Sequence, residues 1–432
     1  MKPPAVAVLF CGTRSRCAGG ARPKLRRSMA WRRERTTPMT AGVSPGSKSD
    51  FDVLDEQFVA DPHAVYARLR SECPVAHADR YGGYWLISRY DDVREAARNT
   101  DVFSSRGGIV IPSVDNPLPF LPIELDPPEH SQFRKPLQGW FSMSRLMALQ
   151  DDIRGMVVER LDSIVDLRCA DLCAELAGPI PPIVIAQLLG LDKSHWPVFR
   201  AMAEQLVTAA ERGDSAANIE AMGWLFTFMA EQIAMRKNEP QDDLLTFMSQ
   251  LQIDGATITD QDAIGLALFT LIAGHETTTG AVGSMLLHLA RDTAAQQRLR
   301  EEPASIAKAV EEVLRLDPPV PNLARTVTRE VTVGGVDLVP GDRVLLSWAS
   351  ANRDADAFSE PDTLVIDRPS NNHLAFGTGI HRCLGANLAR LEMRIIIEEV
   401  LARIPTFRIA DEAEVVVGGV LARGPRVLPI IW

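Results

Sequence analysis

The sequence predicts a mainly α-helical protein with small β-sheets, and two features of its apolar pattern carry that prediction. Apolar residues recur every three to four positions over long segments, which is the period of an α-helix. Alternation of apolar and polar residues, which is typical of a half-buried strand, is confined to short segments. A chain of 432 residues with 46% hydrophobic and 24% charged residues is long and apolar enough for a large folded core.

The helical and strand-like segments follow one another without a low-complexity linker or an internal repeat. In chain order, the predicted helices are 62–72, 90–99, 146–167, 182–189, 196–212, 216–237, 260–290, 294–300, 305–316 and 385–404. The predicted strands are 84–88, 329–333, 343–348 and 414–432, with a hairpin turn at Gly334-Gly335. Two irregular segments, 104–128 and 354–379, are long for a compact domain, so we expect them to serve the function.

The first 49 residues differ in charge from the rest of the chain. They hold eleven Lys or Arg against one acidic residue, Glu34, and they are rich in Pro, Gly and Ser. We expect residues 1–49 to form a disordered leader and residues 50–432 to form one domain. Met1, Met29 and Met39 are the alternatives for the true start. A signal peptide is not indicated, because the apolar stretch is short and the basic residues follow it.

Charge and cysteine content exclude several classes of protein. Since the whole chain has a net charge of -10, residues 50–432 carry -20 and are a poor binder of nucleic acid. The six cysteines form no CxxC pair, which argues against a zinc ribbon and favours the reducing cytoplasm. The apolar stretch 264–274 is too short to span a membrane, so we expect a buried core helix there.

The segment Phe376-Gly-Thr-Gly-Ile-His-Arg-Cys-Leu-Gly385 joins an irregular loop to a helix. Gly377 and Gly379 allow a tight turn that approaches a flat ligand closely. A cysteine at the start of a helix is stabilised as a thiolate by the helix dipole and by backbone N–H groups, and a thiolate binds soft metals. A lone cysteine is more often a small buried hydrophobe, but the motif around Cys383 favours a metal ligand.

A second motif, Ala273-Gly-His-Glu-Thr-Thr278, places polar groups in the longest apolar helix. Buried polar groups are costly unless they are hydrogen-bonded. Gly274 opens space, and Thr277, Thr278 and Ala281 share its helix face, so the hydroxyls border a groove of small residues. The alternative is a local role, in which the hydroxyls bond to carbonyls one turn earlier and the acid pairs with a neighbour.

With these motifs the sequence resembles the cytochrome P450 superfamily, whose cysteine motif is Phe-Gly-x-Gly-x-(His or Arg)-x-Cys-x-Gly. All six defined positions are present, and the resemblance extends from about residue 50 to the C-terminus. It implies a single-domain P450 fold with haem b between the long distal helix and the cysteine loop. The residues that it implies at the haem are Cys383 as the iron ligand, with Phe376, Gly377, Gly385, Ala273 and Gly274. It also implies Thr277 as the oxygen-side alcohol and Glu276 as the proton-relay acid.

The resemblance implies two further sets of residues that support the cofactor. Glu312 and Arg315 stand three apart on a helix, and although most such pairs are surface pairs, Arg368 is expected to complete a buried structural cluster. Haem propionates are carboxylates that need cationic or N–H partners when buried. The partners implied for them are His130, Arg134, Arg325 and His381.

The segments that surround the substrate in the resembled family have apolar inward candidates in this chain, so we expect a compact hydrophobic substrate. Asn322 and Arg106 are the candidate polar anchors. The apolar candidates are Ile109, Val110, Ile111, Val114, Leu118, Phe120, Val320, Leu323, Val420 and Leu421.

The expected activity is that of a haem-thiolate monooxygenase, which uses O2, two electrons and two protons; the thiolate favours O–O cleavage. We expect the electrons to come from a separate ferredoxin and its NAD(P)H-dependent reductase, docking near Arg134, Lys135 and Arg382, in the cytoplasm and without a membrane. A peroxygenase, isomerase or dehydratase of the same fold often lacks the acid–alcohol pair that this chain keeps. A non-catalytic haem sensor or carrier is the other alternative, but apolar access loops have no purpose in it.

Overall fold

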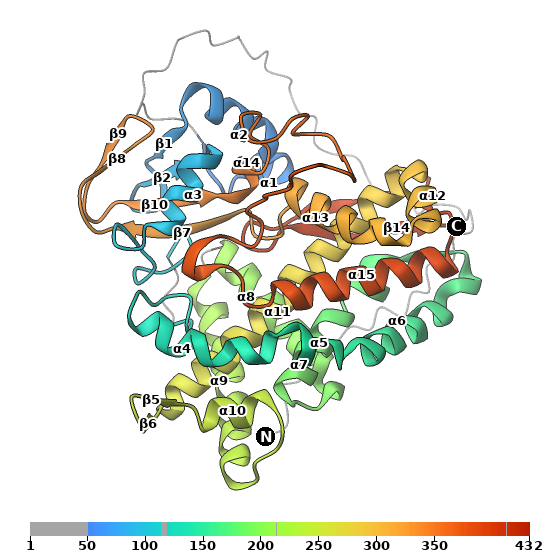
Figure 1. Ribbon diagram of the computed structural model, residues 1–432, viewed down its shortest axis with the longest axis horizontal. Coiled ribbons are helices and arrows are strands. Elements are labelled where there is room, and N and C mark those ends of the chain that lie inside the picture. The colour runs from blue at the N-terminus through green and yellow to red at the C-terminus, as the bar shows by residue number, and fades with distance from the viewer. Residues whose placement is uncertain (1–50, 114–118, 213, 412) are drawn as a thin grey trace, which may run out of the picture. The chain divides into compact units, whose positions relative to one another are not determined.

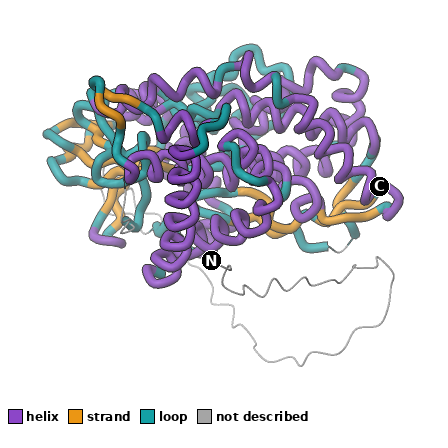
Figure 2. Tube along the Cα trace, turned by 90° about the horizontal axis from the view of Figure 1, so that it is seen from below, coloured by secondary structure: helices purple, strands orange, loops and turns teal. Residues whose placement is uncertain are grey.

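The computed structural model of the protein describes residues 51–432 except 114–118, 213 and 412. The predicted leader, residues 1–49, and two predicted pocket residues, Val114 and Leu118, lie outside the described residues. The described part is mainly α-helical with small sheets, so the predicted fold class is confirmed. Most of the strands gather on one side of the helices, and a second group lies near the C-terminus (Figure 2).

With one exception, the predicted helices begin and end within two residues of helices in the structure. The helices in the described residues are α1 (Glu56–Ala60), α2 (Pro62–Glu72), α3 (Tyr90–Arg98), α4 (Glu129–Leu137), α5 (Met143–Met147), α6 (Gln150–Ile164), α7 (Ile180–Leu189), α8 (Trp196–Arg212), α9 (Ser215–Asn238), α10 (Leu244–Ser249), α11 (Asp260–Arg291), α12 (Thr293–Glu301), α13 (Ile306–Leu316), α14 (Trp348–Ala351) and α15 (Ala386–Arg403).

The exception is the predicted helix 146–167, which is wrong as one continuous element. The chain leaves α5 after Met147 and enters α6 at Gln150. At the break, the N–H of Ala148 donates to Arg145 and the N–H of Leu149 donates to Leu146, so tight three-residue bonds replace the α-helical ladder. The apolar pattern hides this break, because Leu146 and Ile153 are buried on both sides of it.

The strands form one five-stranded sheet and several small ones. They are β1 (Val75–Ala78), β2 (Tyr84–Ile87), β3 (Phe103–Ser104), β4 (Cys169–Asp171), β5 (Gln252–Ile253), β6 (Ala256–Thr257), β7 (Asn322–Val327), β8 (Val331–Val333), β9 (Val336–Leu338), β10 (Arg343–Ser347), β11 (Arg408–Ile409), β12 (Val416–Gly418), β13 (Gly424–Val427) and β14 (Pro429–Ile431). The largest sheet has the order β1-β2-β10-β7-β3, in which β10 is parallel to β2 and antiparallel to β7. The other sheets are β11-β14-β4, β12-β13, β5-β6 and β8-β9.

Strand β7 was not predicted from the apolar pattern, although it lies inside the five-stranded sheet. Its residues do not alternate, because Ala324 and Arg325 are adjacent and both are buried. The predicted hairpin between β8 and β9 is confirmed, and both of its glycines, Gly334 and Gly335, have the positive φ that such a turn requires. The predicted strand 414–432 divides into β12, β13 and β14.

Helix α11 lies at the centre of the fold and organises the site. It begins with a capping box in which the Thr259 hydroxyl accepts from the N–H of Asp262 and the Asp262 carboxylate accepts from the N–H of Thr259. Helices α7, α9 and α15 and strand β13 pack against it, and Figure 1 shows α11 in the middle of the helices. The stretch 264–274 lies in α11 and is mostly buried, as expected. Within the described ranges, no helix is both long and apolar enough to cross a membrane.

Candidate functional site

A cavity of about 350 Å³ lies between α11 and the loop that carries Cys383. Its walls also come from α4, α8, α9, β7, α15 and the irregular segment before α4. Most of its lining side chains are apolar, and it brings together residues that stand more than two hundred positions apart in the sequence. The predicted cofactor residues that line it are His130, Arg134, Ala273, Gly274, Arg325, Phe376, Gly377, His381, Cys383 and Gly385, and the predicted catalytic residues that line it are Glu276 and Thr277.

The loop before Cys383 folds tightly under the cavity. Gly377 and Gly379 have φ angles of 65° and 70°, a region that residues with a Cβ rarely adopt. A Cβ on Gly379 would also lie only 3.2 Å from the carbonyl oxygen of Ala97. The N–H of Cys383 then donates to the Phe376 carbonyl at 2.8 Å, which closes the loop and turns the thiol toward the cavity.

The electrostatic surroundings of Cys383 only partly match the expected thiolate. Burial raises the pKa of the Cys383 thiol, while the N–H of Gly385 and the guanidinium of Arg134 act to lower that pKa. The groups that favour the anion are therefore present, but they do not outweigh desolvation on their own. A coordinated metal cation deprotonates a thiol outright, so the pocket suits a thiolate that is bound to a metal.

Four nitrogen-bearing side chains converge at one part of the cavity wall. His130 and Arg134 come from α4, Arg325 comes from β7, and His381 stands two residues before Cys383. The rings of His130 and His381 lie 4.4 Å apart, and Arg134 donates to the carbonyl of Arg382. In the described part of the chain, none of the four forms an ion pair with a carboxylate.

These four side chains lack a carboxylate partner, and two of them, His130 and Arg325, are fully buried, whereas Arg134 and His381 are half-buried. Both ring nitrogens of His130, Nδ1 of His381 and Nε of Arg325 are buried without a hydrogen-bond partner. Burial lowers the pKa of His130 to about 4, that of His381 to about 2 and that of Arg325 to about 10. Two carboxylates placed among them would restore the missing hydrogen bonds and charge balance. The four residues therefore fit the two propionates of a haem, which they would hold on the side of the cavity where they gather.

On the other side of the cavity, α11 presents the second predicted motif. Gly274, Thr277, Thr278 and Ala281 all line the cavity, as their shared helix face predicts. The space beside Gly274 differs from the expectation, because a Cβ there would lie 2.7 Å from Cγ1 of Ile185 on α7. Gly274 thus lets α7 approach α11 closely, and Ile185 rather than empty space fills part of the expected groove.

Thr277 and Glu276 border the cavity and also make local bonds. The Thr277 hydroxyl donates to the carbonyl of Ala273, one turn earlier, at 2.8 Å. Glu276 is 4% exposed, and Arg426 of β13 donates to it at 2.7 Å. Both contacts are those expected if Thr277 and Glu276 have only a local structural role. The two residues nevertheless also line the cavity. Beside Glu276, burial lowers the pKa of His275 to about 3, which keeps that imidazole neutral.

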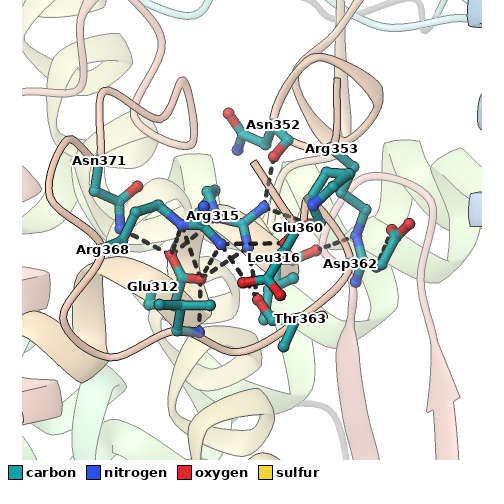
Figure 3. A network of polar contacts seen from close by, with 12 residues as sticks. Glu312, Arg315, Leu316, Asn352, Arg353, Glu360, Asp362, Thr363, Arg368 and Asn371 are labelled. Carbon is teal, nitrogen blue, oxygen red and sulfur yellow. Dashed lines mark hydrogen bonds and ion pairs between the residues drawn. The ribbon is translucent and has the colours of Figure 1, made fainter. Parts of the chain in front are cut away.

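The Glu312 cluster lies at the end of α13 and anchors the chain that leads to Cys383 (Figure 3). Arg315 donates to both carboxylate oxygens of Glu312 at 2.8 and 2.9 Å, and both residues are fully buried. Arg368, from the segment before the cysteine loop, donates to the same carboxylate at 3.0–3.1 Å. Burial alone would raise the pKa of Glu312, but the hydrogen bonds from the two arginines outweigh it and lower that pKa.

Replacing Glu312 by Gln should destabilise the protein by about 3–5 kcal/mol, because two buried guanidiniums lose their charge partner. We expect a lower thermal unfolding midpoint and less bound haem. Asp367→Asn is the matched control, since Asp367 precedes Arg368 but pairs with Arg298 and Lys308 at the surface, where such pairs contribute little. Equal effects of the two substitutions would contradict a structural role for the cluster.

The predicted substrate residues are placed unevenly by the structure. Ile109, Val110, Phe120, Val320, Leu323 and Leu421 line the cavity, whereas Val420 and Ile111 do not. Neither candidate polar anchor reaches it: Asn322 bonds with Tyr66, and Arg106 pairs with Glu129 at the surface. Lining residues that sequence reasoning missed include Ile185, Leu206, Asn218, Phe269, Thr270 and Glu392. Helical periodicity marks most of them as core and cannot say which core positions border a cavity.

Glu392 is the least expected of the missed residues. It lies on α15 at 1% exposure, and its carboxyl has no hydrogen-bond partner in the described part of the chain. Burial alone raises its pKa well above the ordinary value for a glutamate. The folded protein therefore keeps this proton to a higher pH than the unfolded chain does, and the stability that follows is lost as the pH rises toward the folded-state pKa.

Replacing Glu392 by Leu should therefore stabilise the fold by roughly 1–3 kcal/mol at neutral pH, with a smaller gain near pH 4, where the unfolded chain also binds the proton. The thermal midpoints of the two proteins, measured between about pH 4 and 8, give the difference. Glu392→Gln, which keeps the shape but cannot ionise, should remove the same pH dependence. A gain that is equal at all pH values would contradict this account.

Comparisons with known proteins place these observations in context. A family model described as Cytochrome P450 matches residues 216–408. The chain is 33% identical to Cytochrome P450 130 of Mycobacterium tuberculosis over 88% of this chain and 97% of that protein. It is 36% identical to Vitamin D(3) 25-hydroxylase of Pseudonocardia autotrophica, over 83% of this chain and 90% of that protein. It is 32% identical to Steroid C26-monooxygenase of Mycolicibacterium smegmatis, over 89% of this chain and 97% of that protein.

Solved structures agree with the sequence relatives. The crystal structure of CYP109E1 from Bacillus megaterium in complex with testosterone has a TM-score of 0.80 and 30% identity, covering 86% of this chain and 98% of that one. The structure of a mutant of P450 EryK in complex with erythromycin B has a TM-score of 0.80 and 33% identity, and the match covers 86% of this chain and 97% of that one.

Proposed function

The chain belongs to the cytochrome P450 family, and from that premise we propose that it oxidises a compact hydrophobic compound with electrons from a separate ferredoxin and its NAD(P)H-dependent reductase. Haem is the cofactor and monooxygenation is the reaction, as in the named relatives. The haem iron, held by a thiolate, supplies the activation of O2 and the cleavage of its O–O bond. The substrate class, the electron donor and the roles of individual residues in proton delivery belong to this proposal.

The observation that carries the substrate class is the apolar wall of the cavity. Ile109, Val110, Phe120, Val320 and Leu323 come from two separate segments and face the same space, which favours an apolar substrate body held by shape. The relatives support this, since their names refer to steroids and vitamin D(3), and the solved structures hold testosterone or erythromycin B.

We assign proton delivery to Thr277 and Glu276. The Thr277 hydroxyl donates a hydrogen bond to the Ala273 carbonyl, so its oxygen lone pairs remain available to accept a hydrogen bond from a water that can deliver a proton into the cavity. Glu276 can resupply that water, because its carboxylate faces the cavity and is held by Arg426, which is 35% exposed and leads toward solvent.

We assign the electron donor from the positive charge on the protein surface near Cys383. Lys135 and Arg382 are exposed, and Arg134 joins them through its bond to the Arg382 carbonyl. This local basic group stands out against the acidic domain and suits an acidic ferredoxin. Cytoplasmic location is part of the same proposal, because NAD(P)H-dependent reductases supply electrons there.

The proposal is tested with purified protein, a bacterial ferredoxin, its reductase and NADH, on a panel of small hydrophobic compounds. We expect a product that is one oxygen atom heavier and whose formation depends on both electron-transfer proteins. Charge reversal of Lys135 and Arg382 to Glu should raise the ferredoxin concentration that is needed for half-maximal rate. Product that forms with hydrogen peroxide but never with NADH would instead identify a peroxygenase.

A further inference from the structure

Asn218 is a polar side chain that lines the cavity from α9, where its described neighbour in the lining from α8 is the apolar Leu206. We infer that the substrate carries a neutral hydroxyl or carbonyl oxygen, bound by the Asn218 amide, on a part of the molecule that lies away from the oxidised carbon. This inference rests on the proposed monooxygenase function and adds the chemical class of the substrate.

The side chain of Asn218 is buried, yet it has no protein partner. It is 4% exposed and borders the cavity from α9. Its backbone N–H donates to the Asp214 carbonyl at 3.0 Å, but within the described ranges its side-chain amide makes no hydrogen bond. The amide atoms of Asn218 are not completely enclosed by protein, and since the residue lines the cavity, we infer that these atoms are accessible from the cavity. A buried amide in this position needs a partner from a ligand or from water.

Of the four polar side chains that α11 presents to the cavity, three are already engaged, and the fourth, Thr278, offers a hydroxyl without a hydrogen-bond partner among the described residues. The hydroxyl of Thr270 donates to the Leu266 carbonyl at 2.7 Å, and that of Thr277 donates to Ala273. Glu276 is paired with Arg426. Asn218 differs from these because its two donors and its acceptor are all open, which suits an oxygen that can accept, donate or do both.

The position of Asn218 sets where that oxygen lies on the substrate. Asn218 and Leu206 enter the cavity from α9 and α8, which pack on each other and on α11. Cys383 enters from the loop before α15, so the amide and the iron ligand belong to different walls. A substrate that fills the space between them places its oxygen at one wall and its oxidised carbon at the other.

The part of the cavity lining that comes from α8 and α9 favours a neutral oxygen. The lining residues that α8 and α9 contribute, Leu206 and Asn218, are uncharged. A carboxylate or an ammonium group there would be desolvated without a counter-charge, which is costly. A neutral hydroxyl or carbonyl needs only a hydrogen bond. A substrate without such a group would displace water from the amide and leave it unpaired, so the site discriminates against it.

The test measures binding of three carbon skeletons, steroid, decalin and adamantane, each as the hydrocarbon, the alcohol and the ketone. Binding to the full-length haem protein is followed by the Soret shift on water displacement, which requires no electrons. We expect at least one alcohol or ketone to bind roughly 10- to 100-fold more tightly than its own hydrocarbon. Asn218→Leu should remove that preference by weakening the oxygenated compound and strengthening the hydrocarbon, and Asn218→Ser should restore part of it.

Gln232→Leu is the matched control, because it replaces an amide on the same helix α9 outside the cavity lining and should change nothing. The carbon monoxide spectrum and the thermal midpoint of each variant establish that it folds and holds haem. Equal binding of hydrocarbons and their oxygenated partners, no binding by any oxygenated compound, or an unchanged preference in Asn218→Leu would each overturn the inference. Since no turnover is measured, these outcomes leave the monooxygenase proposal standing, whereas that proposal fails if no compound is oxidised with NADH.

Discussion

Replacing Cys383 by His abolishes the red-shifted Soret band that the reduced carbon monoxide complex of this protein is expected to show. The band depends on electron donation from a thiolate, which imidazole does not supply. The other residues that we assign to the haem, Arg325 and His381 among them, are unchanged in this variant, so we expect some haem to remain bound without that band. The measurement is the difference spectrum of the reduced protein with and without carbon monoxide.

Cys173→Ser is the control for this experiment. Cys173 is a buried cysteine whose thiol donates to the Pro425 carbonyl, and burial raises its pKa to about 12, so it remains a neutral thiol. A serine can make the same hydrogen bond, and we expect the thiolate spectrum to be unchanged. Persistence of the red-shifted band in Cys383→His would contradict the assignment of Cys383 as the iron ligand.

Replacing Thr277 by Ala should keep substrate binding and NADH consumption but divert electrons from product to hydrogen peroxide. The hydroxyl oxygen of Thr277 faces the cavity and is the group that we assign to hold the proton-donating water. Without directed proton delivery, partly reduced oxygen leaves as peroxide. Proton relays are typically worth about 10² to 10⁴ in rate, so the loss should be large. The measurement is product formed per NADH consumed, with peroxide assayed in parallel.

The structure supplies a close control for Thr277. Thr270 lies two turns earlier on α11, lines the same cavity and donates to the carbonyl four residues back in the same way. Thr270→Ala therefore removes an equivalent hydroxyl about 10 Å along the helix and should leave the coupling of NADH to product unchanged. Full coupling in Thr277→Ala, or equal uncoupling in both variants, would remove the proposed role of Thr277.

Glu276→Gln should slow oxygen turnover itself, because an amide cannot pass a proton from solvent to the cavity. This substitution also removes the ion pair between Glu276 and Arg426. Arg426→Gln is therefore the control that separates loss of the ion pair from loss of the carboxyl group. If Arg426 acts only by holding Glu276, its substitution should have no further effect in the Glu276→Gln background. An unchanged rate of NADH consumption in Glu276→Gln would contradict the relay.

Much of the fold was predictable because local pattern and packing agree. The periodicity of α11 and α15 reflects a continuous apolar face, so their bounds follow from the sequence. Strand β7 was not predictable in this way, because Arg325 is a charged residue that is nevertheless buried, at a position where it lines the cavity. A polar residue that is buried for function breaks the pattern on which prediction depends.

The sequence by itself determined the family, and with it the chemistry that we propose for the site, because the motif around Cys383 and the Glu276-Thr277 pair lie within short stretches whose residue order is specific. Only the tertiary structure decided which other residues meet there. Arg426 reaches Glu276 from 150 positions away, and Asn218 and Glu392 enter the cavity from helices whose patterns mark them only as interior positions. The physical reason is that helical periodicity records burial against some neighbour, whereas the identity of that neighbour is set by how the helices pack.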